Sequence, residues 1–189
     1  MVDTETTGLS FAENGLIQLA AAVLDEELEV LDTFCQDVCP PKGYLIGAGS
    51  LEINGFTVER IEKGGGYEKV CGEFLVFLNK NFKTAPVSVG QFFPFDYAFL
   101  HMAFAKVGLE KELGAALGND FIDTKVIVNT LNLKANLARQ PLPFPSTSLS
   151  KPGGLKDKLS IDLSKFQAHD ALGDVLATRE VLVRLLKLM

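Results

Sequence analysis

The chain has 189 residues, of which 47% are hydrophobic and 22% are charged, and its formal net charge is −6. This length and this apolar fraction predict a single globular domain that spans residues 1–189. No apolar run reaches the ~18 residues that a membrane-spanning helix needs, and the N-terminus lacks the basic and apolar regions of a signal peptide. We therefore expect a cytoplasmic protein with no membrane partner.

The charge is distributed unevenly along the chain. Residues 1–124 carry a net charge of −11, whereas residues 125–189 carry a net charge of +5. Phosphate affinity normally comes from Lys and Arg, so the C-terminal third is the expected phosphate-facing surface if the ligand is a nucleic acid. Lysines that are simply solvated would account for the same excess equally well.

The first part of the chain predicts a hairpin. Residues 16–24 form an apolar run typical of a buried strand, residues 25–27 are acidic and predict a turn, and residues 29–35 predict the returning strand. A short helix near residues 50–54 and a break at the glycines 64–66 follow.

The rest of the chain alternates between helical and strand patterns. Apolar spacing predicts helices over residues 67–82 and 96–108, a strand over 85–90, and a short strand over 121–123 that enters a helix to residue 133. Residues 134–154 contain four of the eight prolines and predict a surface loop with a functional role. Residues 167–187 predict a final amphipathic helix. This order predicts an α/β fold with a mixed sheet flanked by helices.

Acidic side chains are the main candidates for chemistry. Asp3 and Glu5 lie two residues apart in a predicted strand, so both point to the same face. Adjacent carboxylates repel, and a hard cation such as Mg²⁺ or Mn²⁺ relieves that repulsion. An Asp-x-Glu pair alone is also common on protein surfaces.

Three further residues join these candidates. Asp96 starts a predicted helix directly after a strand, where α/β proteins often build their sites, although a helix cap explains it as well. His169 and Asp174 lie at the start of the last predicted helix, five residues apart. Within one helix they would point ~140° apart, so both can face one site only if His169 precedes the helix.

The segments Asp3–Leu9, Phe95–Leu100 and His169–Asp174 together resemble the three motifs of the DEDD exonucleases, histidine branch. This family includes proofreading exonuclease subunits and ribonuclease T-like enzymes. The resemblance runs in order over essentially the whole chain, and it implies a ribonuclease H-like fold. It also implies that Thr6, Thr7 and Leu9 line the pocket for the terminal nucleotide, with Glu5 near the 3′ hydroxyl.

The expected activity is a metal-dependent 3′→5′ exonuclease that hydrolyses phosphodiester bonds at the 3′ end of single-stranded DNA or RNA. The expected ligands of two Mg²⁺ or Mn²⁺ ions per site are Asp3, Glu5, Asp96 and Asp174. His169 is the expected general base for the attacking water, because imidazole titrates near neutral pH. Candidate partners are a polymerase subunit or a second copy of the chain.

Aromatic side chains are further candidates for substrate contacts. Phe92, Phe93 or Phe56 could stack on bases, although phenylalanines more often fill the core. Of these, Phe92 is the one we assign to substrate binding.

Two features depart from the family pattern. Only Met1 and Val2 precede Asp3, where the family usually has a longer apolar strand. Gln91 and Phe92 stand where the family often has His-Asn ahead of the middle motif, so we expect a polar tether near the site to be absent.

Two rival hypotheses remain. One is a catalytically inactive nucleic-acid-binding or scaffolding module of the same fold. The other is an HD-type metal phosphohydrolase built on the pair His169 and Asp170, which would need further histidine ligands on an all-helical scaffold.

Overall fold

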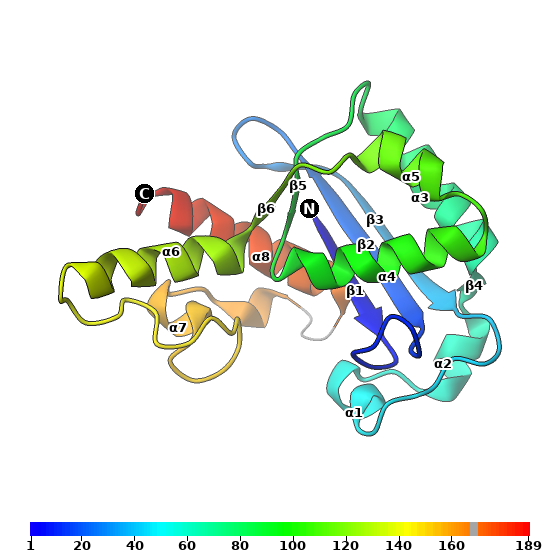
Figure 1. The fold of residues 1–189 in the computed structure, drawn as a ribbon, viewed down its shortest axis with the longest axis horizontal. Helices are drawn as coiled ribbons and strands as arrows, with labels where there is room; N and C mark the ends of the chain where they lie inside the picture. The colour runs from blue at the N-terminus through cyan, green and yellow to red at the C-terminus, as the bar shows by residue number, and fades with distance from the viewer. Residues whose placement is uncertain (167–169) are drawn as a thin grey trace.

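A four-stranded sheet in the order β1-β2-β3-β4 forms the centre of the molecule. The computed structural model describes residues 1–166 and 170–189. The strands β1, β2 and β3 pair in antiparallel fashion, and β4 pairs with β3 in parallel (Figure 1). The strand bounds are β1 Val2–Thr6, β2 Leu16–Leu24, β3 Val30–Cys39 and β4 Gly65–Gly66.

Two short strands form a second, parallel ladder. β5 covers Ser88–Gly90 and β6 covers Phe121–Asp123, with Gly90 opposite Asp123. In Figure 1 this pair lies beside β1. The predicted hairpin and the two later predicted strands are therefore confirmed.

Helices connect and cover the strands. Their bounds are α1 Ser50–Asn54, α2 Val58–Lys63, α3 Tyr67–Asn81, α4 Phe93–Lys106, α5 Glu110–Leu117, α6 Thr124–Leu137, α7 Leu155–Lys158 and α8 Ala171–Leu186, with a 3₁₀ turn at Leu163–Lys165.

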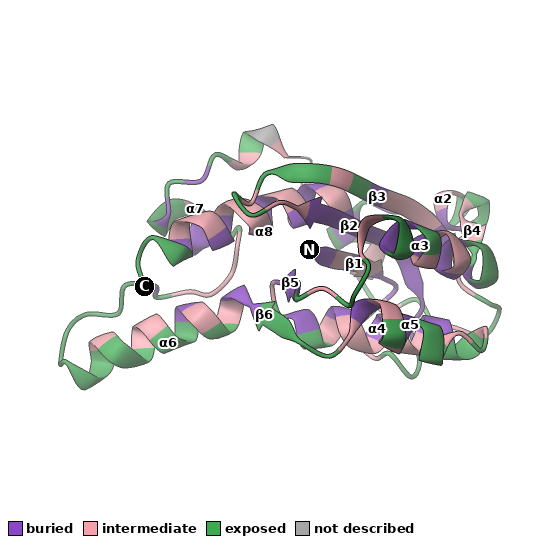
Figure 2. Ribbon diagram, turned by 90° about the horizontal axis from the view of Figure 1, so that it is seen from above, coloured by how far each residue is buried: buried purple, intermediate pink, exposed green. Residues whose placement is uncertain are grey.

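The central strand β2 is apolar on both faces because helices cover both. Leu19 and Ala21 belong to the large core cluster that β2 shares with α3, α4 and α5, whereas Ala20 and Ala22 pack with Ala171 on α8. The two alanines on the second face let α8 approach the sheet closely. Figure 2 shows α8 and α4 on opposite sides of β1 and β2. The α/β class with a mixed sheet flanked by helices is thus confirmed, and the all-helical scaffold of the HD hypothesis is excluded.

Phenylalanine rings contact one another in the largest core cluster. The ring of Phe74 contacts those of Phe34 and Phe104, at centroid distances of 5.2 and 6.3 Å. The apolar stripe predicted for α3 is buried as expected, and its members are Val70, Cys71, Phe74, Phe77 and Leu78.

Several element bounds differ from the sequence prediction. α4 begins at Phe93 rather than Asp96, because Pro94 in the first turn needs no backbone donor and has a φ that suits a helix. α6 continues to Leu137, since no helix-breaking residue occurs before Pro141. The short helices α2 and α5 had no predicted counterpart, because each is too short for its apolar period to stand out.

The segment that follows α6 is less of a surface loop than predicted. Phe144 is buried, and its backbone N–H and C=O both bond to the side-chain amide of Asn132, at 3.0 and 2.8 Å. Phe144 belongs to a second core cluster together with Leu155 and Leu185. The proline-rich segment is therefore fixed to α6 and α8 at its middle.

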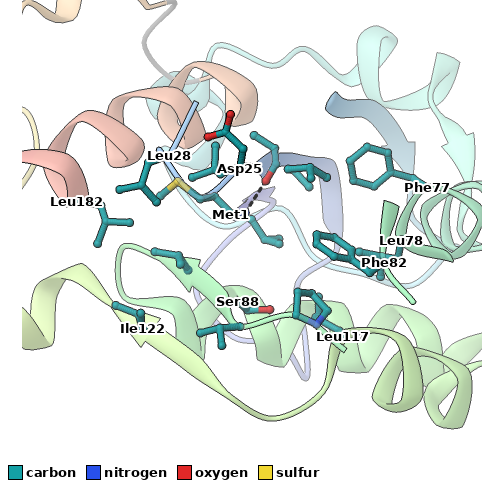
Figure 3. Close-up of a pocket in the computed structure, with 18 of the residues that line it drawn as sticks. Met1, Asp25, Leu28, Phe77, Leu78, Phe82, Ser88, Leu117, Ile122 and Leu182 are labelled. Atoms are coloured by element: carbon teal, nitrogen blue, oxygen red, sulfur yellow. Dashed lines mark hydrogen bonds between the residues drawn. The ribbon is translucent and has the colours of Figure 1, made fainter. Parts of the chain in front are cut away.

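An apolar cavity of about 360 Å³ lies between the two sheets. Figure 3 shows Leu78, Ile122 and Leu182 around it, from α3, β6 and α8. Met1 also lines it, and the Met1 amino group donates a hydrogen bond of 2.6 Å to the Ala22 carbonyl. As far as the described residues go, its lining includes none of the four predicted acidic ligands, so it is a packing gap between the ladders and not the candidate site.

Within residues 1–166 and 170–189, no helix combines the length and the apolar character required to cross a membrane.

A buried tyrosine hydroxyl offers a test of this packing. The Leu16 N–H donates to the Tyr67 hydroxyl at 2.9 Å, which fixes the start of β2 to the start of α3. Tyr67→Phe leaves that buried N–H without its acceptor, so the free energy of unfolding should fall by about 1–3 kcal/mol in urea denaturation. Tyr97→Phe is the control, since the Tyr97 hydroxyl bonds to Asn119 at an exposed position. Equal stability of the two variants would contradict the assignment.

Candidate active site

Strand β1 presents two of the predicted ligands on one face. Val2, Thr4 and Thr6 are buried, whereas Asp3 and Glu5 alternate with them and are only partly buried. This alternation is the two-residue period of a strand. The two carboxylates therefore point to the same side of the sheet, as predicted from the sequence.

Asp174 joins this pair from the first turn of α8. Carboxylate oxygens of Asp3, Glu5 and Asp174, one from each residue, all lie within 4.8 Å of one another. The residues come from opposite ends of the chain, and the packing of α8 against β1 and β2 brings them together. An oxygen-only group of this size fits a hard divalent cation such as Mg²⁺ or Mn²⁺.

Asp96 approaches β1 from its other edge, out of the first turn of α4. Its Oδ1 accepts hydrogen bonds from the N–H and the hydroxyl of Thr4, at 3.0 and 2.7 Å. The Thr4 N–H is available for this bond because it points away from β2. Asp96 is outside the closest group of three, but its charge raises the pKa of Asp3. The helix-cap alternative fails for its side chain, since the bonds run to the strand.

Burial and mutual repulsion raise the pKa values of these acids. Burial first, and then the charges of Asp174 and Asp96, raise the pKa of Glu5 to about 8. The pKa of Asp3 lies well above its usual range for the same two reasons, and burial also raises the pKa of Asp96 although the Thr4 bonds lower it. Protonation of the carboxylates relieves this repulsion, and so does a bound cation. The residues present therefore fit a metal centre.

A buried glutamine holds the start of α8 against the sheet. The Gln18 side chain accepts a hydrogen bond from the Ala171 N–H (2.7 Å) and donates to Asp170 (3.0 Å) and Asp37 (2.9 Å). Gln18 lies opposite Glu5 in the β1–β2 register. Because Asp174 follows one turn after Asp170, this network fixes the distance between Asp174 and Glu5.

Arg60 completes the network on the far side. Its guanidinium forms a two-pronged ion pair with Asp37, at 2.7 and 2.8 Å, and lies 3.8 Å over the ring of Phe56. The sequence-based prediction missed Gln18, Asp37 and Arg60. One signal was available: Gln18 is the single polar residue in the apolar run Leu16–Leu24. A polar residue buried in such a run needs partners.

His169, the predicted general base, lies outside the described residues, as do Gln167 and Ala168. The described part of the last helix begins at Ala171, with Asp170 at its cap position. The role of His169 therefore stays a prediction.

A cavity of about 540 Å³ opens beside Glu5. Thr6 and Leu9, which the resemblance assigns to the terminal-nucleotide pocket, line it, and the Leu9 side chain is 87% exposed; their contact with a nucleotide stays a prediction. The remaining lining comes from β1, the turn after it, α1 and α4, and it includes Thr4, Glu5, Gly8, Ser10, Asn14, Gly47, Ala48, Ser50, Ile53, Asn54 and Phe95. This lining mixes apolar residues with hydroxyl, amide and carboxylate side chains, a combination that suits a small ligand with both apolar and polar parts.

Thr7, the third residue that the resemblance assigns to the terminal-nucleotide pocket, is not among the residues that line this cavity. It is buried, its hydroxyl donates to the Leu45 carbonyl at 2.6 Å and it accepts the Gly15 N–H at 2.9 Å. Thr7 therefore fastens the turn that shapes the cavity, rather than lining the cavity. The neighbouring Gly8 is required there, since a Cβ would lie 2.5 Å from the Asn14 side chain.

The three candidate stacking residues differ in burial. Phe56 and Phe93 are buried in the core, whereas Phe92 is 50% exposed at the start of α4. Phe92 does not line the 540 Å³ cavity, but Phe95 does, and their rings lie 6.4 Å apart at an interplanar angle of 18°. The sequence-based prediction missed Phe95, although it directly precedes Asp96.

Gln91 contradicts the expectation that a polar tether is absent here. Its side-chain amide donates to the Thr147 carbonyl at 2.8 Å, and its oxygen accepts a bond from the Thr124 hydroxyl. Gln91 thereby ties the proline-rich segment to the site. Ser148 and Leu149 from that segment line a small cavity together with Asp174.

The model of the exonuclease family RNase_T matches residues 1–182 of the chain. The chain belongs to this exonuclease family. The prediction of a nuclease of the DEDD type is confirmed, and divalent metal ions are general to this family.

Relatives of this exonuclease domain include PolC-type DNA polymerases III. The protein from Thermotoga petrophila is 30% identical over 190 residues, which cover 100% of this chain and 12% of that protein. The protein from Bacillus cereus is 28% identical over 185 residues, which cover 98% and 11%. The chain thus spans about an eighth of the length of these relatives.

Solved structures of E. coli Exonuclease I share the fold. One, a complex with a dT13 oligonucleotide, matches with a TM-score of 0.76 at 22% identity, covering 98% of this chain and 40% of the other. A second structure of Exonuclease I matches with a TM-score of 0.75 at 23% identity, covering 99% and 40%. The predicted ribonuclease H-like fold is confirmed for the exonuclease domain.

The raised pKa values predict how stability depends on pH without metal. Between its ordinary pKa of 4.5 and its folded pKa of about 8, Glu5 keeps a proton in the folded state that it has lost in the unfolded state. The free energy of unfolding should therefore fall as pH rises through this window, and level off above it. In EDTA, the melting temperature of wild type should fall from pH 5 to about 8, and that of Glu5→Gln should fall less steeply. Parallel curves for the two proteins would contradict the assignment.

Proposed function

We propose that the chain is a metal-dependent 3′→5′ exonuclease that removes nucleotides from the 3′ end of single-stranded nucleic acid. The observation that carries the proposal is that carboxylate oxygens of Asp3, Glu5 and Asp174 lie within 4.8 Å of one another, and that Glu5 also lines the 540 Å³ cavity. Such a carboxylate cluster attracts divalent cations, and a cation-loaded cluster beside the cavity suits a phosphodiester ligand.

Asp3, Glu5, Asp96 and Asp174 would hold two Mg²⁺ or Mn²⁺ ions. When bound, such a pair supplies positive charge for both the attacking and the leaving oxygen of the phosphodiester. Thr4 holds Asp96 in place through two hydrogen bonds to Oδ1, so Oδ2 would be the oxygen that binds a metal ion. Glu5 reaches both the acidic cluster and the cavity, so it also suits a contact with the terminal 3′ hydroxyl.

Other residues would bind the substrate and activate the water. Thr6, Leu9 and Phe95 would hold the terminal nucleotide in the 540 Å³ cavity, while Thr7 keeps the surrounding turn closed. We assign His169 the role of general base: it takes a proton from the water that attacks phosphorus, and the bond from phosphorus to the upstream 3′ oxygen breaks. The leaving oxygen then takes a proton from solvent.

The comparisons support DNA as the first substrate to test. The relatives are DNA polymerases, and the Exonuclease I structure holds a thymidine oligonucleotide. We therefore propose that residues 1–189 act as one exonuclease domain beside a polymerase; self-association of the chain stays a prediction. RNA is the second substrate to test, since its phosphodiester bond is the same and only contacts with the 2′ hydroxyl distinguish the two.

An end-labelled assay tests this function directly. With Mg²⁺ or Mn²⁺, the protein should shorten 5′-labelled single-stranded DNA from its 3′ end and should stop in EDTA. Asp174→Asn and His169→Ala should each lower kcat by at least about 100-fold, since each removes a group that acts on the reacting atoms.

Asp120→Asn is the matched control for Asp174→Asn, because it makes the same chemical change at an exposed carboxylate. Its activity should equal that of wild type. A folded, metal-supplied wild type that degrades neither DNA nor RNA would contradict the proposal and favour the inactive binding module.

A further inference from the structure

Phe92 has a backbone conformation that is unusual for its residue type. Its φ of 66° and ψ of 42° lie in the left-handed region, which Gly and Asn adopt far more readily than large side chains. The Asp123 side chain holds it there: Oδ1 accepts the N–H of Phe92 and the N–H of Lys125, each at 2.9 Å. Strain of this kind persists where the surrounding structure imposes it, and it concentrates at functional sites.

Core packing does not explain the choice of phenylalanine. The next residue, Phe93, is buried and fills the core, whereas half of Phe92 is exposed. An exposed aromatic ring in a strained position contributes little to folding, and asparagine would relieve the strain. The exposed half of the ring is therefore available to a ligand.

The Phe92 ring contacts both a residue that lines the cavity and a lysine. Phe95 lines the cavity, the Phe92 ring is nearly parallel to that of Phe95, and Lys125 Nζ lies 4.0 Å from the centroid of Phe92. Lys125 is also the first cation of the C-terminal part of the chain, which carries the net positive charge. An aromatic face beside a cation is the arrangement that holds one nucleotide of a single strand.

We propose that Phe92 and Lys125 form a second nucleotide subsite, in which Phe92 stacks on the base that precedes the 3′-terminal nucleotide and Lys125 neutralises the adjoining phosphate. This inference rests on the proposed function and adds a determinant of single-strand preference. Stacking tolerates any base, but it requires a base face that no neighbouring base covers. A paired duplex end would not offer that face.

Fluorescence anisotropy with a labelled single-stranded thymidine oligonucleotide tests the subsite. Ca²⁺ replaces Mg²⁺ in this assay, because it takes the same oxygen ligands in a looser geometry. Phe92→Asn should raise the Kd about tenfold, as expected for the loss of one stacked base. Its melting temperature should not fall, since asparagine accepts the left-handed backbone.

Two comparisons separate binding from structure. Phe121→Asn is the matched control: Phe121 is 48% exposed and its ring packs on Phe93 at 5.3 Å. That change should lower the melting temperature and leave the Kd alone. Thymidine 5′-monophosphate, which fills only the terminal cavity, should bind wild type and Phe92→Asn equally.

Lys125→Met tests the cation separately. It keeps an apolar side chain of similar length and removes the charge, so the slope of log Kd against log salt should shrink by roughly 0.7–1.

The outcomes distinguish this subsite from the proposed function. Equal oligonucleotide affinity of wild type and Phe92→Asn would overturn the subsite, as would a weakened affinity accompanied by weaker monophosphate binding and a lower melting temperature. A wild type that binds the strand but degrades none in Mg²⁺ would overturn the proposed function and leave the subsite standing. A wild type that binds no strand would overturn the subsite.

Discussion

Repulsion among carboxylates is the constraint on which the site depends. Asp3, Glu5 and Asp174 lie within 4.8 Å of one another, with Asp96 close enough to raise the pKa of Asp3. Partly buried acids so close together favour protonation or a cation, and the pKa of Glu5 at about 8 expresses that preference. The fold must hold these groups together against their repulsion, and the hydrogen bonds from Thr4 to Asp96 and the packing of α8 against β1 and β2 contribute to this.

The holding structure is a line of polar contacts across the sheet. It runs from Arg60 to Asp37, then through Gln18 to the start of α8, and it leaves Asp174 facing Glu5. Arg60 lowers the pKa of Glu5, but this effect is the smallest of those acting on Glu5. Its main contribution is therefore to hold Asp37 in position. Replacing any part of this line would move a ligand without touching the reacting atoms.

Much of the fold could be predicted because the apolar periods are long and regular, as in β2 and α3. The convergence of Asp3 and Glu5 followed from the strand period alone, whereas the placement of Asp174 needed the family resemblance. Phe95, Arg60 and the closing role of Thr7 could not be predicted, because each depends on which segments meet in space. The tether made by Gln91 was missed for the same reason: its partners Thr124 and Thr147 are more than 30 residues away.

The central claim is that the acidic cluster is a metal centre. Calorimetric titration of the metal-free protein with Mn²⁺ at pH 8 tests it most directly, with Asp174→Asn and Asp120→Asn titrated in parallel. The account predicts binding of two ions per chain by wild type and by Asp120→Asn, and the loss of at least one of them in Asp174→Asn. Equal binding by all three proteins, or no binding by a folded wild type, would contradict it.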